Sequence, residues 1–157
     1  MSLAEVAVQE LFLALGAFIA FRCGAAAERR QNCKAMLRDR TSTLIARLDR
    51  FLPSVASYID TWEGAAIEDR RRKEHSILHE LKCIQMDASH IDKICGRSYF
   101  HKMRKADITA LAITLKECAT RSPFLGMGHV PPEWKESTTR STISLRHALL
   151  LVERQSM

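Results

Sequence analysis

The fold of this chain depends first on Leu11–Phe21, LFLALGAFIAF, eleven residues without a polar side chain. A bilayer core of roughly 30 Å takes up about 20 mostly apolar residues in a helix. The strict run is too short for this, but the wider segment Val6–Ala27 has a sufficient length. Its polar residues Gln9, Glu10 and Arg22 lie near its ends, where they cost less than at the centre of a bilayer. The sequence therefore predicts a single transmembrane helix, whose main apolar residues are Leu11, Phe12, Leu13, Leu15, Phe18, Ile19 and Phe21.

The charges on the two sides of this segment predict its orientation. Glu5 and Glu10 precede the apolar run without any Lys or Arg, whereas several basic residues follow it. Because basic flanks stay on the cytoplasmic side, we expect the N-terminus outside the inner (cell) membrane and the remaining chain in the cytoplasm. Basic side chains beside a membrane also attract anionic lipids. The expected lipid head-group contacts are Arg22, Arg29, Arg30 and Lys34.

Two other interpretations of the apolar segment stay open. A cleaved signal peptide would explain the small residues Ala25–Ala27, but the positively charged region that normally precedes the apolar core is absent. A wholly buried core helix would explain why the strict apolar run is shorter than a membrane crossing.

The composition predicts an all-α protein with an anchor over residues 1–27 and a bundle over residues 28–157. Glycine and proline number only six and four in 157 residues, while good helix formers are abundant. The five cysteines are odd in number and show no C-x-x-C spacing. This pattern argues against a disulfide framework and is typical of a reducing compartment such as the cytoplasm.

Four helical segments follow the apolar run, and their short connections favour an antiparallel bundle. We expect them over Glu28–Trp62, Ala65–Cys95, about Ala106–Thr120 and about Ser137–Glu153. Nothing between Ala25 and Leu37 is a strong helix breaker, so the first helix can continue directly from the membrane helix. Pro53 should kink this helix or split it in two. Gly64 and Gly96 are the expected stops of the first and second helices.

The first of these helices carries one apolar stripe about 140° wide, as expected of a helix that faces a core. The stripe is longer than a small four-helix core requires. Part of it could therefore pair with a second copy of the chain in the manner of a coiled coil, or the chain's own helices could cover it. The candidate interaction residues on this stripe are Leu37, Leu44, Leu48, Phe51, Val55 and Trp62.

The second helix carries a polar face rich in histidine. His75, His79 and Cys83 are spaced one turn apart, and His90 falls at a similar angle. Two histidines one turn apart can bind a transition metal, a thiolate can join them, and Asp87 is close enough in angle to contribute. An ordinary exposed face explains the same residues, and the H-E-x-x-H and paired C-x-x-C signatures of zinc sites are absent. We therefore expect no metal or other cofactor, and a metal-binding sensor is kept only as a second alternative.

Catalytic signatures are missing as well. The chain has no Gly-rich phosphate loop, no G-x-S-x-G and no recognisable acid pair, so neither an enzyme nor a small-molecule substrate is expected. His101 and His129 lie in or near loops without an identifiable partner. The net charge of +6 could attract nucleic acid, and aromatic and basic residues alternate at Arg97–Arg104, RSYFHKMR.

These observations predict a single-pass membrane protein with an all-helical cytoplasmic bundle that acts through protein–protein contacts, as a scaffold, adaptor or regulator. Its expected partners are another protein or a second copy of itself, together with an anionic membrane surface. The alternative is a soluble basic bundle that binds nucleic acid.

Overall fold

The computed structural model describes residues 3–96, 107–120 and 132–156. It contains four helices, α1 (Leu3–Thr61), α2 (Ile67–Cys95), α3 (Ile108–Thr120) and α4 (Pro132–Ser156), and the described residues form no strand. The predicted all-α class and the number of helices are thus confirmed. The chain divides into two compact units, residues 1–36 and residues 37–157.

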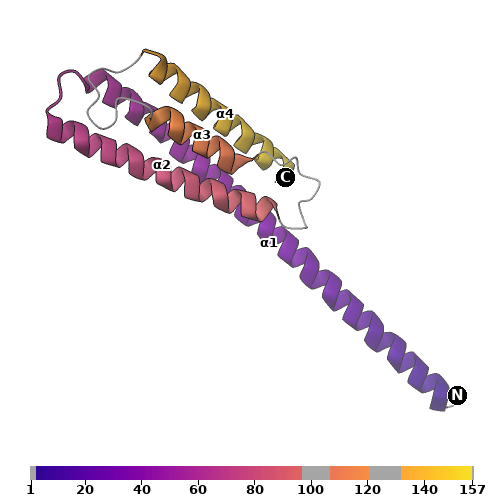
Figure 1. Ribbon diagram of the computed structural model, residues 1–157. Helices are drawn as coiled ribbons and strands as arrows, with labels where there is room; N and C mark the ends of the chain where they lie inside the picture. Colours follow the sequence, from indigo (N-terminus) through magenta and orange to yellow (C-terminus); the bar gives the residue numbers. More distant parts are fainter. Residues whose placement is uncertain (1–2, 97–106, 121–131, 157) are drawn as a thin grey trace. The chain divides into compact units, whose positions relative to one another are not determined.

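The second unit is an up-down-up-down bundle formed by the last part of α1 together with α2, α3 and α4 (Figure 1). α3 packs against both α2 and α4. α1 reaches α2 through the Arg47–Glu80 ion pair and α4 through the Arg146–Asp49 ion pair. Tyr58, later in α1, contacts Glu74, which precedes Glu80 in α2, so these two helices run antiparallel. The short connections between elements led to the same expectation.

The core follows from the spacing of apolar residues along α1 and α2. On both helices the buried positions recur at alternating steps of about four and three residues, the spacing that keeps one seam facing its neighbours in a left-handed bundle. In the part of α1 that belongs to the second unit and in the turn after it they are Leu37, Thr41, Leu44, Leu48, Phe51, Val55, Tyr58 and Trp62. In α2 they are Ile77, Leu81, Ile84, Ala88, Ile91 and Ile94.

The stripe that was a candidate surface for a second copy therefore lies in the core of the chain's own bundle. All six candidate residues, from Leu37 to Trp62, are at most 8% exposed. In this fold the helices of the same chain cover these six side chains.

Pro53 does not split α1, and one expected helix limit is corrected. α1 continues through Pro53 without being split, because Pro53 lies on the exposed side, where the carbonyl group that loses its partner can bond to water. α4 begins at Pro132 and not at Ser137. Proline fits the first position of a helix, since its missing N–H would have no partner there in any case. The Trp134 indole in that first turn donates a hydrogen bond of 3.0 Å to the carbonyl oxygen of Ala119.

α1 also extends through the first unit, as the absence of a helix breaker between Ala25 and Leu37 predicted.

In the part of the chain that the structure describes, no helix is both long and apolar enough to cross a membrane. The transmembrane helix expected over Leu11–Phe21 is therefore not supported. The uninterrupted apolar run covers about 16 Å of helix, roughly half the thickness of a bilayer core, and Arg22, Glu28 and Arg29 follow it closely.

Candidate functional site

The most unusual surface of the protein is the apolar part of α1 from Phe12 to Phe21, called the apolar segment below. Its large side chains are exposed, from 53% for Ile19 to 74% for Leu13 and Phe21. Ten residues of helix make about three turns, so these side chains point in every direction around the axis and leave no polar face. Contiguous exposed apolar surface of this kind marks a place that contacts lipid or another protein.

Basic residues follow the apolar segment directly. Arg22, Arg29 and Arg30 are exposed, and Lys34 is half-buried. The guanidinium carbon of Arg22 lies 5.8 Å from the centre of the Phe18 ring, one turn earlier on the same helix. This cation–π contact holds the charge of Arg22 beside the last turn of the apolar segment. Among the described residues, no carboxylate forms an ion pair with any of these four basic side chains.

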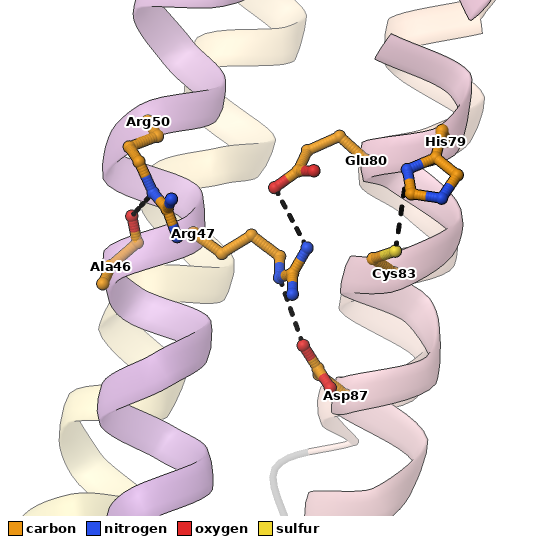
Figure 2. A network of polar contacts seen from close by, with 7 residues as sticks. All are labelled: Ala46, Arg47, Arg50, His79, Glu80, Cys83 and Asp87. Carbon is orange, nitrogen blue, oxygen red and sulfur yellow. Dashed lines mark hydrogen bonds and ion pairs between the residues drawn. The ribbon is translucent and has the colours of Figure 1, made fainter. Parts of the chain in front are cut away.

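Within the bundle, a polar cluster joins α1 to α2 through Arg47 (Figure 2). Arg47 Nη1 lies 3.2 Å from Glu80 Oε1, and Arg47 Nε lies 3.2 Å from Asp87 Oδ2. The first contact is also a hydrogen bond, whereas the second is an ion pair without hydrogen-bond geometry. The two carboxylates are spaced two turns apart on one flank of α2, so a single guanidinium spans them. The cluster fixes how far α1 and α2 are shifted along each other.

Asp87 is thus engaged by Arg47 and does not join the histidine face. On that face, His79 Nδ1 lies 3.9 Å from Cys83 Sγ (Figure 2), while His75 and His90 are exposed. Across the described residues, no group of three or more His, Cys, Asp or Glu side chains is placed to hold a metal ion. The structure therefore brings together two of the residues considered as ligands and supplies no third.

The first turns of α2 also bind the end of α1. The Tyr58 hydroxyl donates a 2.7 Å hydrogen bond to Glu74 Oε1, and Lys73 Nζ donates one of 2.8 Å to Thr61 Oγ1. Arg70 stacks its guanidinium 4.7 Å from the ring centre of Trp62. Burial, followed by the hydrogen bond to Glu74, raises the pKa of Tyr58 well above its usual value. Arg70, Lys73 and Glu74 therefore tie the start of α2 to the end of α1 and the turn after it.

A shallow pocket of about 220 Å³ lies between α1 and α2, beside the Arg47 cluster. Its lining residues are Arg50, Phe51, Ser54, Ser76 and Glu80. Arg50 donates a hydrogen bond to the carbonyl oxygen of Ala46 on its own helix (Figure 2), and Glu80 is paired with Arg47. These residues include no nucleophile activated by a base and no pair of carboxylic acids, so the pocket offers no recognisable catalytic chemistry.

Three predicted features lie outside the described residues: the alternating aromatic and basic stretch Arg97–Arg104, and the loop histidines His101 and His129. No protein-family model matches the chain, and comparisons with curated proteins and with solved structures give no significant match. The candidate site therefore rests on the chemistry of the chain itself. Its two parts are the exposed apolar segment with its basic flank and the polar contacts between α1 and α2.

Proposed function

We propose that this protein is a membrane-attached helical bundle, whose apolar segment inserts into a lipid bilayer and whose bundle binds another protein. The observation that carries the proposal is the exposure of large apolar side chains on all sides of α1 between Phe12 and Phe21. Full burial of one such side chain is worth about 1.5–3 kcal/mol. With six of them more than half exposed, their removal from water is worth on the order of 10 kcal/mol.

The absence of a polar face favours lipid over a protein surface as the environment of the apolar segment. A helix that docks into a groove keeps its polar residues on the side that faces water, and so does a helix that lies flat on a membrane. A helix that is apolar all round needs an apolar environment on every side. The hydrocarbon of a bilayer supplies this environment without requiring a specific partner.

The proposed topology has the bundle on the cytoplasmic side of the inner membrane and the N-terminus outside. It is supported by the basic residues that follow the apolar segment and by the acidic residues Glu5 and Glu10 that precede it. Adding a membrane-impermeant protease to spheroplasts, in which the outer face of the inner membrane is accessible, tests this topology, because it should remove an N-terminal tag and spare a C-terminal one.

The role proposed for the bundle is to bind another protein, as a scaffold, adaptor or regulator. The pocket beside the Arg47 cluster is shallow, and its lining residues include no recognisable catalytic group. α4, in contrast, exposes the large apolar side chains Ile143 and Leu151, which are 57% and 40% exposed. Such side chains are suited to contacts with a protein partner.

The decisive experiment is flotation of the full-length protein with lipid vesicles, followed by an alkaline wash. We expect the wild type to float and to resist the wash, and Phe18→Glu to remain in the soluble fraction. Ile143→Glu is the matched control, because Ile143 is exposed to almost the same extent as Phe18, 57% against 60%. The proposal is wrong if the wild type does not bind vesicles, or if Ile143→Glu removes binding as completely as Phe18→Glu.

A further inference from the structure

We propose that the bilayer which takes up the apolar segment is anionic on the bundle side, and that α1 enters it end-on with Arg22, Arg29 and Arg30 at its lipid phosphates. This inference rests on the membrane attachment proposed above and adds the lipid class and the direction of insertion. The basic flank is exposed and has no carboxylate partner among the described residues, so its charge is available to lipid head groups.

The end-on direction follows from the side chains of the apolar segment. A helix that lies in the plane of the membrane surface needs one apolar and one strongly polar face. Between Phe12 and Phe21 the exposed side chains are apolar in every direction, so a flat orientation would leave half of them in water. Insertion along the helix axis covers all of them.

The positions of the basic residues along α1 then determine which of them reach the phosphates. At about 1.5 Å per residue, Arg22 lies about 2 Å beyond Phe21, Arg29 and Arg30 about 12–14 Å, and Lys34 about 20 Å. Side chains on a helix lean toward its N-terminus, which here is the membrane side, and a long arginine can extend several ångströms further in that direction. Arg29 and Arg30 therefore approach the head-group layer, whereas Lys34, with the same lean and reach, stays more than one Debye length away, which is about 10 Å at 0.1 M salt.

This placement revises the set of head-group contacts expected from the sequence. Lys34 was expected to bind lipid together with the three arginines, but it is half-buried and lies furthest from the apolar segment. A basic residue near an anionic surface raises the membrane partition constant about 5-fold. We therefore expect Arg29 and Arg30 together to contribute about 25-fold on anionic vesicles, and Lys34 less than about 2-fold because of screening.

The test measures partition constants of the full-length protein on neutral phosphatidylcholine vesicles and on vesicles that contain phosphatidylglycerol. We expect Arg29→Gln/Arg30→Gln to lower the constant about 25-fold on anionic vesicles at 0.1 M salt and to leave it unchanged on neutral vesicles. Two exposed arginines of α2 provide the control with the same change in net charge, Arg71→Gln/Arg72→Gln.

The possible outcomes separate this inference from the proposed function. Equal binding to neutral and anionic vesicles would leave membrane attachment standing and overturn the lipid class. If Arg71→Gln/Arg72→Gln lowered the partition constant on anionic vesicles as much as Arg29→Gln/Arg30→Gln, binding would depend on the net charge of the protein and not on where the arginines lie. This result would overturn the assignment of Arg29 and Arg30 to the lipid phosphates. A loss in Lys34→Gln as large as that in Arg29→Gln would indicate a flat helix and overturn the end-on direction. No binding to either vesicle would remove the proposed function itself.

Discussion

Arg47 joins α1 to α2 through two ion pairs. Its guanidinium lies between two carboxylates, and the side chains of Arg47, Glu80 and Asp87 are only 25%, 31% and 17% exposed. Ion pairs at exposed positions contribute about 0–1 kcal/mol, whereas removal of one partner from a fully buried pair costs about 3–5 kcal/mol. This cluster lies between these limits, because water still reaches part of each side chain.

Replacing Arg47 by methionine should lower the free energy of unfolding by about 1–2 kcal/mol. Methionine keeps most of the aliphatic length but leaves Glu80 and Asp87 close together without a cation. Arg146→Met is the control, because the pair of Arg146 with Asp49 is more exposed, at 44% and 53%, and should contribute less than about 1 kcal/mol. Urea unfolding of the full-length variants measures both changes. Equal losses in the two variants would show that the Arg47 cluster is no stronger than a surface pair.

Cys95 makes stability depend on pH in alkaline solution. Burial, and then the nearby Asp92 carboxylate, raises the pKa of its thiol to about 11, whereas an unfolded cysteine ionises near pH 8.5. The stability that Cys95 provides is therefore complete below about pH 8.5 and is lost as the pH rises toward 11. At pH 8 we expect iodoacetamide to modify Cys95 far more slowly than the exposed Cys23, because the raised pKa keeps the Cys95 thiol almost entirely protonated at this pH. Mass spectrometry of timed samples measures both rates, and equal rates would contradict the raised pKa.

The start of α3 shows how one helix of the bundle stabilises another. Asp92, on α2, accepts hydrogen bonds at Oδ2 from the backbone N–H of Thr109, at 2.7 Å, and from the hydroxyl of the same residue. Its Oδ1 accepts a longer one, 3.3 Å, from the backbone N–H of Ile108. Asp107 adds the usual cap by accepting from the backbone N–H of Ala110. The first N–H groups of a helix have no acceptor within the helix, so carboxylates at this end accept their hydrogen bonds. The negative charge of these carboxylates also interacts favourably with the positive end of the helix dipole.

Substituting Asp92 by alanine should therefore destabilise the protein by about 2 kcal/mol, toward the upper end of the range for lost caps. The loss should be concentrated at α3, so amide hydrogen exchange of residues 108–111 should accelerate more than that of the core of α2. Asp60→Ala is the control, because Asp60 is exposed and forms no hydrogen bond or ion pair among the described residues. A control that costs as much as Asp92→Ala would disprove the capping role.

For the molecule as a whole, the sequence predicts best what depends on neighbours along the chain. The alternating spacing of Leu37, Leu44 and Leu48 indicates a core-facing stripe without any knowledge of the other helices, and the structure buries all three. Pro132 was harder to interpret, because a proline pair is typical of a loop as well as of the first turn of a helix. The contact that places Pro132 in a helix involves Trp134, two residues later. Its burial and its hydrogen bond to Ala119 hold the first turn of α4 in place.

The contacts between α1 and α2 could not be predicted in the same way. Arg47 and Glu80 are 33 residues apart, and their pairing depends on the relative shift of two helices. Along the sequence, the only indication of this pairing is that Glu80 and Asp87 lie on the same flank of α2. The spacing there suggests Asp87 as a metal ligand and not as a partner of Arg47. The exposed apolar segment is different again, since periodicity does not distinguish a bilayer from a protein core as its environment.

Because the chain divides into two compact units, we expect substitutions on the surface of the first unit to leave the stability of the second unit unchanged. Phe18→Glu/Ile19→Glu alters residues that are 60% and 53% exposed and belong to the first unit. We expect the urea midpoint of the bundle to stay within the change typical of surface substitutions, about 0.5 kcal/mol. Tryptophan fluorescence measures this well, because both Trp62 and Trp134 belong to the second unit. A large loss of stability would show that the apolar segment is part of the folded core.

The long stripe of α1 also has a consequence for the order of synthesis. α1 leaves the ribosome before any of the helices that cover it, and α4 is complete only 94 residues after Trp62. At about 5–20 residues per second, the side of the stripe that faces α4 stays bare for roughly 5–20 s. Only residues 62–66 separate α1 from α2, so α2 can fold back at once and bring Glu80 and Asp87 to Arg47. The growing chain thus passes through a two-helix hairpin with one apolar side, and this side is prone to aggregation until the later helices cover it.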